Sequence, residues 1–433
     1  MKHPGEIPFL VYADRDGNIF DLPGLRMSGR SGRVFHPVDP VDLIPLPEGS
    51  ELFVIPGRMP VGWDDATDEM IVLEDMPDGS RGAPRAVAAF MAPAYTQTAM
   101  TAWRRDDSDS GAQVLPLFAY TAVGWWKGRF WAAGFRSDRD KRQDFNRFNR
   151  KRIRKKTLAG LKRHRDNRLV QHLGRCSLSY GCPAARNYFL ERWEAPLPTS
   201  PVCNARCLGC LSLQPEEGPP STQERITFVP RVSEVVEVAA GHLKKTGSGI
   251  VSFGQGCEGE PLMQGKLLEK AVRAIREKTD SGTINLNSNA SRPDHVASLA
   301  QNGLDSMRIS MNSVRKDYYD RYYRPSTYEF SHVTQSWNIM KEAGKYVSLN
   351  LFVMPGLTDE IEEIDRLSDL IERYGLDLIQ LRNHNIDPDW YLDAIDYSHT
   401  GYRTGIRGMV NILKKRFPEL RFGYFNPPLA GTS

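Results

Sequence analysis

The stretch that decides the fold is Cys203-Asn204-Ala205-Arg206-Cys207-Leu208-Gly209-Cys210, in which three cysteines follow the spacing C-x3-C-x2-C. Three thiolates this close in sequence can bind one metal centre. A [4Fe–4S] cluster usually has four protein ligands, so a cluster held by three would leave one iron open to another molecule. Cysteines two to four residues apart also suit zinc, and spacing alone does not choose between the two metals.

Downstream of these cysteines, short apolar strands alternate with amphipathic helices. Counting a strand that enters the cysteine stretch, six strands with helices between them are predicted, as a parallel barrel requires. We therefore predict an α/β fold with a partial (β/α)6 barrel. The strands predicted after the cysteines are Ile250–Phe253, Ile284–Leu286, Met307–Met311, Tyr346–Val353 and Leu378–Leu381.

Composition divides the chain into four predicted segments. Residues 1–135 contain short apolar runs broken by Gly, Pro and Asp, which is typical of a β-rich domain. Residues 136–190 form a basic helical linker that carries Cys176 and Cys182, and residues 191–400 form the barrel. Residues 401–433 are a C-terminal extension that adds a helix and an edge strand.

The basic linker is rich in Arg and Lys between Arg147 and Arg168, with few acidic residues. Basic stretches of this density can follow phosphate groups, so RNA is a candidate partner. The alternative is a solvated helical linker. We favour the linker, because no RNA-binding motif accompanies the charge.

Bulk composition places the protein among ordinary globular chains. Of 433 residues, 40% are hydrophobic and 25% are charged, with a formal net charge of +4. Six cysteines, three of them in the quoted stretch, favour a reducing compartment over a disulfide framework. The first residues lack the apolar run of a signal peptide, and no apolar segment reaches the ~20 residues of a membrane span. We therefore expect a cytoplasmic protein without a membrane span.

A second motif follows the second predicted strand: Gly254-Gln255-Gly256-Cys257-Glu258-Gly259-Glu260-Pro261. Together with the C-x3-C-x2-C stretch at the end of the first strand, it resembles the radical S-adenosylmethionine (radical SAM) superfamily. The segment is similar to that family's Gly-Gly-Glu-Pro motif, with Glu258 in place of the first glycine. A further departure is Gly209, because the residue before the last cysteine is often aromatic in the family.

The resemblance implies an enzyme in which Cys203, Cys207 and Cys210 hold a [4Fe–4S] cluster. The open iron would chelate the amino and carboxylate groups of SAM, and an electron from the cluster would cleave the sulfonium. The product would be a 5′-deoxyadenosyl radical that abstracts hydrogen from a substrate. An electron donor such as flavodoxin or ferredoxin and an anaerobic setting are expected with this chemistry.

The resemblance also implies a set of SAM contacts at the carboxyl ends of the barrel strands, where active sites of parallel barrels form. The family motif would meet the amino group, the ends of the third and fourth strands would meet the carboxylate and ribose, and the segment after the fifth strand would lie along adenine. These residues are Gly259, Glu260, Pro261, Ser288, Asn289, Ser310, Asn312, Val353, Pro355 and Gly356.

Three residues are predicted to act on substrate. Gln380 and Arg382 leave the sixth strand toward the substrate or the SAM carboxylate, and a guanidinium suits an anion. The alternative for Arg382 is a salt bridge to Asp387 or Asp389. Cys257 would contact substrate or donate hydrogen near SAM.

The remaining cysteines suggest a second metal centre. Cys176, Cys182 and Cys257 could hold a second iron–sulfur cluster that relays electrons or anchors substrate. The alternative is that they are buried structural thiols, because free cysteine often behaves as a small hydrophobe.

The predicted function is therefore a radical SAM enzyme acting on an unidentified substrate. Two alternatives stay open. One is an RNA-modifying radical SAM enzyme that uses the basic arm. The other is a non-catalytic, zinc-stabilised nucleic-acid-binding module.

Overall fold

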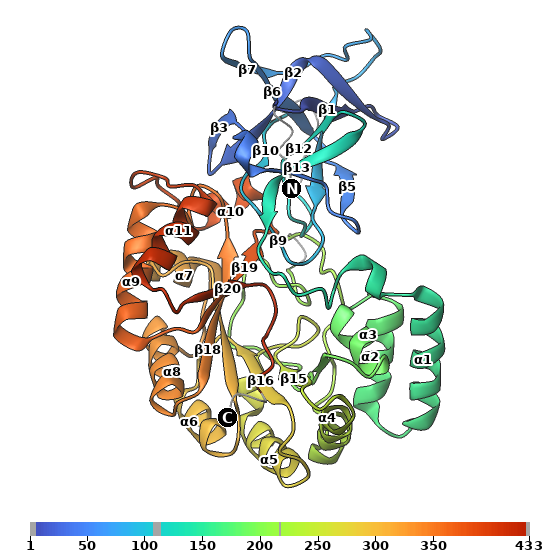
Figure 1. The fold of residues 1–433 in the computed structure, drawn as a ribbon, viewed down its shortest axis with the longest axis vertical. Helices are drawn as coiled ribbons and strands as arrows, with labels where there is room; N and C mark the ends of the chain where they lie inside the picture. The colour runs from blue at the N-terminus through green and yellow to red at the C-terminus, as the bar shows by residue number, and fades with distance from the viewer. Residues whose placement is uncertain (1–5, 107–113, 216–217, 430–433) are drawn as a thin grey trace.

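The computed structural model describes residues 6–106, 114–215 and 218–429. It has three parts along the chain: an antiparallel sheet, a group of three helices, and a parallel sheet with helices (Figure 1). Residues 1–5, which include the start of the chain considered for a signal peptide, and residues 430–433 lie outside the described residues.

The first part is a 13-stranded antiparallel sheet, so the β-rich prediction is confirmed. Asp14 accepts hydrogen bonds from the Asp16 and Asn18 amides, both 2.9 Å long, and so holds the turn between the first two strands. The strands are β1 (Phe9–Ala13), β2 (Ile19–Ser31), β3 (Val34–Pro37), β4 (Leu43–Pro45), β5 (Glu51–Val54), β6 (Arg58–Asp64), β7 (Glu69–Val72), β8 (Arg85–Phe90), β9 (Tyr95–Gln97), β10 (Met100–Thr101), β11 (Trp103–Arg105), β12 (Val123–Trp126) and β13 (Arg129–Arg136). Two short 3-10 helices accompany them, η1 (Pro40–Asp42) and η2 (Phe145–Arg147).

The basic segment folds into three helices, α1 (Arg150–Arg163), α2 (Arg168–Leu178) and α3 (Pro183–Phe189). Asn149 and Asn167 cap α1 and α2 by accepting hydrogen bonds from backbone amides. In α1 only Ile153 and Thr157 are buried, so its Arg and Lys side chains face solvent. The helix therefore rests on α2 and α3 by a narrow contact and presents a basic outer face.

The third part is a parallel seven-stranded sheet in chain order, which confirms the predicted half-barrel class. Its central strands are almost wholly buried, as expected when helices cover a parallel sheet. The sheet has one strand more than the six of the predicted barrel, because the edge strand predicted in the C-terminal extension pairs with it. The strands are β14 (Glu194–Pro196), β15 (Ile250–Phe253), β16 (Thr283–Ser288), β17 (Ser306–Met311), β18 (Tyr346–Val353), β19 (Leu378–Asn383) and β20 (Arg421–Gly423).

Helices fill the connections between these strands (Figure 1). None of the described helices is long and apolar enough to cross a membrane. The helices are α4 (Val232–Thr246), the 3-10 turn η3 (Pro261–Gln264), α5 (Gly265–Arg276), α6 (Pro293–Gln301), α7 (Lys316–Tyr323), α8 (Phe330–Glu342), α9 (Ile361–Tyr374), α10 (Pro388–Ala394) and α11 (Ile406–Arg416).

The antiparallel sheet docks over the carboxyl ends of β18 and β19 (Figure 1). The Gln97 amide donates to Asn383 Oδ1 at 2.8 Å, and the Gly32 amide donates to the Pro355 carbonyl at 2.7 Å. In the same region Arg58 pairs with Asp387 at 3.2 Å, with both side chains almost fully buried. The N-terminal part thus covers one side of the barrel mouth.

Candidate active site

The cysteine loop follows β14 and lies against the motif that follows β15. The amides of Gly259 and Glu260 donate to the carbonyls of Ser200 and Val202 at 2.7 and 2.9 Å. A side chain at Gly259 would place its Cβ 2.1 Å from the Val202 carbonyl oxygen, so only glycine permits this approach. The two motifs are therefore locked together by backbone contact immediately before Cys203.

Glu258 stands where the family has a glycine, and its buried carboxylate lies between two strand ends. Its carboxylate accepts hydrogen bonds from the Thr199 and Ser200 amides on one side, at 2.7 and 3.1 Å. On the other side it accepts from the Gly254 and Gln255 amides, at 2.7 and 2.8 Å. Burial raises the pKa of this carboxyl above its ordinary value, although the amides oppose the shift. The carboxylate thus joins the ends of β14 and β15.

Glu260 connects two of the predicted SAM-contact segments, and through Asn289 it reaches the cysteine loop. Its carboxylate accepts from Ser288 Oγ at 2.5 Å, from the Asn289 amide at 2.9 Å and from the Leu262 amide at 3.0 Å. The Asn289 side chain then donates to Asn204 Oδ1, inside the cysteine loop, at 2.9 Å. A carboxylate has about four acceptor positions, so the three bonds leave room for one more donor. Burial raises the pKa of Glu260 to about 7.

Two thiols of the loop, Cys203 and Cys207, lie in surroundings that disfavour their ionised form. Burial and then the nearby Glu260 carboxylate raise the pKa of Cys203 to about 11, and burial raises the pKa of Cys207 well above its usual range. The Arg225 guanidinium donates to Cys210 Sγ at 3.3 Å. Metal ligands must be deprotonated, so a cationic iron centre would supply the missing charge. This donor set fits a [4Fe–4S] cluster.

The space beside Gly209 is filled by other residues. A Cβ on Gly209 would lie 2.6 Å from Ile386 Cδ1 and 3.2 Å from the Tyr322 hydroxyl. An aromatic ring at position 209 would collide with both. Tyr322 therefore supplies an aromatic side chain beside the cysteine loop from a different element, α7.

The other predicted SAM contacts divide into two groups. Ser310 is partly exposed toward the barrel interior, and Asn312 is buried, with its Nδ2 donating to Tyr391 Oη at 3.2 Å. The Oδ1 atom of Asn312 is buried without a partner among the described residues. The segment after β18 is instead covered by the antiparallel sheet. A Cβ added to Gly356, where φ is +94°, would lie 2.1 Å from the Gly32 amide nitrogen.

Val353 and Pro355 are buried in that same covered segment, and the antiparallel sheet supplies the cover. Pro261 begins the short turn η3 under the Glu260 cap and is also buried. The adenine contact predicted for these positions after β18 stays a prediction.

A cavity of about 480 Å3 inside the half-barrel reaches the cysteine loop at Gly209. Arg382 from β19 and Arg308 from β17 both line it. Gln380 joins them, because its Oε1 accepts from Arg308 at 3.1 Å and from Arg382 at 3.4 Å. Neither guanidinium forms an ion pair with Asp or Glu within the described ranges. Burial and then the neighbouring Arg382 charge lower the pKa of Arg308 to about 9.

The salt bridge considered for Arg382 is not formed. Asp387 pairs with Arg58, and Asp389 pairs with Arg30, so both acids are used by the antiparallel sheet. The Arg382 guanidinium instead stacks on the Tyr424 ring, 3.8 Å from its centroid. Sequence analysis missed Arg308, although its alternation with Met307 and Ile309 along β17 is the period-2 signal of an inward-facing residue.

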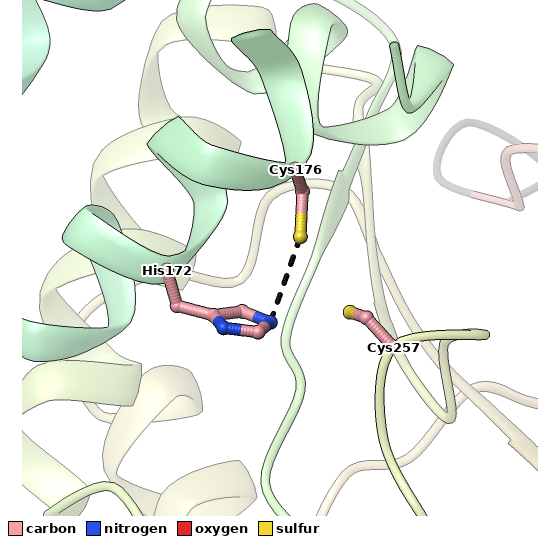
Figure 2. Close-up of side chains that lie close together, drawn as sticks. All are labelled: His172, Cys176 and Cys257. Carbon is pink, nitrogen blue, oxygen red and sulfur yellow. Dashed lines mark hydrogen bonds between the residues drawn. The ribbon is translucent and has the colours of Figure 1, made fainter. Parts of the chain in front are cut away.

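The three cysteines outside the loop gather beside α2. Cys176 and Cys257 face each other, with His172 as an additional neighbour that sequence analysis missed (Figure 2). Cys182 caps the start of α3, and its amide donates to the Cys176 carbonyl at 2.9 Å. Cys257 thus points toward α2, whereas its neighbour Gly256 lines the cavity. Its predicted catalytic role stays a prediction.

A parallel half-barrel with a three-thiolate loop at its carboxyl edge and a buried Glu-centred network defines a cofactor-dependent enzyme domain. Residues 197–368 match the sequence model of the radical SAM superfamily. This match assigns the half-barrel segment to that superfamily, so the non-catalytic zinc alternative for the loop loses its support. No curated protein matches the sequence.

Several solved structures resemble the chain. HydG, a maturase of the [FeFe]-hydrogenase, is 14% identical with a TM-score of 0.39, covering 63% of this chain and 66% of its own. Methylornithine synthase, PylB, is 12% identical with a TM-score of 0.37, covering 64% and 71%. Streptococcus suis SuiB, bound to the precursor peptide SuiA, is 13% identical with a TM-score of 0.39, covering 56% and 53%.

Proposed function

We propose that this protein binds a [4Fe–4S] cluster through Cys203, Cys207 and Cys210 and reductively cleaves SAM. When bound, the cluster and SAM supply an electron and the 5′-deoxyadenosyl radical that abstracts hydrogen from substrate. The hydrogen-bond chain from Glu260 through Asn289 to Asn204 carries this proposal, because it joins the predicted SAM motif to the cysteine loop.

The chain's own residues have separate tasks in this scheme. Glu260 would accept a hydrogen bond from the SAM amino group at its one remaining position. Ser310 and the unpartnered Oδ1 of Asn312 would meet the polar parts of SAM beyond the amino group. Arg225 would donate a hydrogen bond to the cluster ligand Cys210, and the buried walls of the half-barrel would keep water from the radical.

The test is anaerobic reconstitution with iron and sulfide, followed by incubation with SAM and a strong reductant. The wild-type protein should bind about four irons at this site and form 5′-deoxyadenosine. Cys203→Ala, Cys207→Ala and Cys210→Ala should each abolish the product while the chain still folds, because the loop lies at the barrel mouth. Stoichiometric 5′-deoxyadenosine from any of the three would contradict the proposal.

We further propose that the substrate carries an anionic group, a carboxylate or a phosphate. Arg308 and Arg382 face one cavity and share the neutral acceptor Gln380. Glu194 also lines this cavity, but neither guanidinium forms an ion pair with a carboxylate among the described side chains. Both Nε atoms are buried without a hydrogen-bond partner there. Two adjacent, partly buried guanidiniums repel each other, and an anion between them would relieve that repulsion.

A second candidate is an RNA substrate reached through the basic arm. The observation that favours it is the outer face of α1, where Arg150, Lys151, Arg154 and Lys155 are exposed. Binding of tRNA should weaken steeply with added salt and be lost when the charges of residues 150–156 are neutralised. Salt-independent binding, or binding unchanged in that variant, would remove this candidate.

A further inference from the structure

We propose that His172, Cys176 and Cys257 bind a single zinc ion, separate from the cluster of the cysteine loop. Their ligand atoms all lie within 4.8 Å of one another, and His172 Nε2 is 3.5 Å from Cys176 Sγ. Figure 2 shows the three side chains converging from α2 and from the loop after β15. This site does not depend on the proposed function.

The spacing of the ligands on α2 is that of a helical metal site. His172 and Cys176 are four residues apart, so they lie on the same face of the helix, one turn apart. The third ligand comes from a different element, the loop that carries the SAM motif. Two ligands from one helix turn and a third from a facing loop would fill three positions of a tetrahedral zinc ion, and water would fill the fourth.

The distances favour one ion over a second iron–sulfur cluster. Tetrahedral zinc, with Zn–S of about 2.3 Å and Zn–N of about 2.0–2.1 Å, separates a sulfur from a nitrogen ligand by about 3.6 Å. The observed His172 to Cys176 separation agrees with this value. Within the described part of the chain, no other three His, Cys, Asp or Glu residues have their ligand atoms this close. Cys182, which the sequence grouped with this centre, is outside the set.

The location suggests a structural role for the ion. Cys176 and Cys257 are only 1% and 4% exposed, so the ion would sit under the surface. Cys257 immediately precedes Glu258, and the Ile226 amide fixes its carbonyl at 2.8 Å. A zinc ion here would tie α2 to the loop that positions Gly259 and Glu260.

The test uses the full-length Cys203/Cys207/Cys210 triple-alanine variant, which lacks the loop cluster, loaded anaerobically with zinc. We expect about one zinc ion per chain, and a cobalt-loaded sample should show thiolate-to-cobalt charge-transfer absorption. Adding Cys176→Ala, Cys257→Ala or His172→Ala should remove the bound metal. Cys182→Ala is the matched control, and it should retain the metal.

A second measurement, the melting temperature, does not depend on whether the additional variants fold. A chelator should lower the melting temperature of the triple-alanine variant by several degrees, because a structural ion stabilises only the folded chain. About four irons with sulfide at this site in place of zinc would overturn the proposal, as would a metal-free protein after loading. Loss of zinc in the Cys182→Ala control would overturn the ligand set.

Discussion

Two buried carboxylates two positions apart, Glu258 and Glu260, have different partners and different tasks. Glu258 accepts hydrogen bonds mainly from backbone amides of two strand ends, so its acceptor positions are used by the fold. Glu260 bonds to Ser288 and the Asn289 amide and keeps a position for a ligand. The family resemblance identified Glu260. It could not show that a carboxylate at position 258, where the family has glycine, hydrogen-bonds to the backbone amides of two strand ends.

The titration of Glu260 should make SAM binding depend on pH. Burial raises its pKa to about 7, so the carboxyl is largely protonated at pH 6 and ionised at pH 8. In the ligand-free protein a raised carboxyl pKa adds stability that is fully present below the unfolded value and is lost as pH rises through 7. SAM needs the ionised acceptor, so its affinity should increase by about tenfold from pH 6 to 8.

Calorimetric titration of the reconstituted protein with SAM would measure this dependence. Glu260→Gln is the control, because it keeps the shape but cannot ionise. The titration of SAM itself is common to both proteins, so the difference between their pH profiles isolates Glu260. Parallel profiles would show that Glu260 does not meet SAM.

The arginine pair in the cavity should bind anions. Inorganic phosphate should raise the melting temperature of the wild-type protein by binding between Arg308 and Arg382. Arg308→Gln or Arg382→Gln should each weaken the phosphate affinity by about tenfold or more, because each removes charged hydrogen bonds. Arg373→Gln, on the exposed face of α9, is the control and should leave the affinity unchanged. Equal phosphate shifts in all four proteins would contradict an anion site in the cavity.

At the scale of elements, the site depends on two loops that touch through their backbones. Gly259→Ala would push a Cβ against the Val202 carbonyl, 2.1 Å away, and displace the residue before Cys203. We expect most of the cluster iron to be lost while the secondary structure is kept, as measured by iron per chain and circular dichroism. Gly241→Ala is the matched control, because nothing lies within 4 Å of its added Cβ. Helical alanine should stabilise that control by about 0.5–1 kcal/mol.

If Gly259→Ala retains its full iron content, the contact between the two loops does not position the cluster ligands. If both glycine variants lose iron, the effect comes from general destabilisation instead of the local clash.

At the scale of elements, the features predicted correctly are those formed by residues close together in sequence. The strand ends that carry Ser288 and Asn312 were predicted because they follow apolar strands in a chain that resembles the radical SAM family, whose SAM contacts lie at strand ends. Arg308 was missed because the search for site residues considered strand ends, whereas Arg308 lies inside β17 on the face that alternates with Met307 and Ile309. The His172 to Cys257 contact joins residues far apart in sequence, and local periodicity carries no signal for such a pair.

At the scale of the whole molecule, the antiparallel sheet and the barrel are joined by buried charges that sequence reasoning could not pair. Asp387 and Asp389 follow β19 closely and were considered as partners of Arg382, but their partners come from β6 and β2. The same docking covers Pro355 and Gly356, two of the predicted SAM contacts. Packing between residues far apart in sequence determines which surface the antiparallel sheet covers. The residues next to a motif do not determine it.

Removing the buried cation at this junction should loosen the sheet from the barrel. Arg58 and Asp387 are 3% and 2% exposed, and the same Asp387 carboxylate accepts the Leu115 amide at 3.1 Å. Arg58→Met would leave that carboxylate buried without its cation, which costs about 3–5 kcal/mol. We expect two separate thermal transitions in place of one, and faster protease cleavage between the sheet and the helices.

Arg104→Ala is the control, because it breaks an exposed pair on the same sheet and should change stability by less than about 1 kcal/mol. A single unshifted transition in Arg58→Met would mean that the Arg58–Asp387 pair does not hold the two parts together.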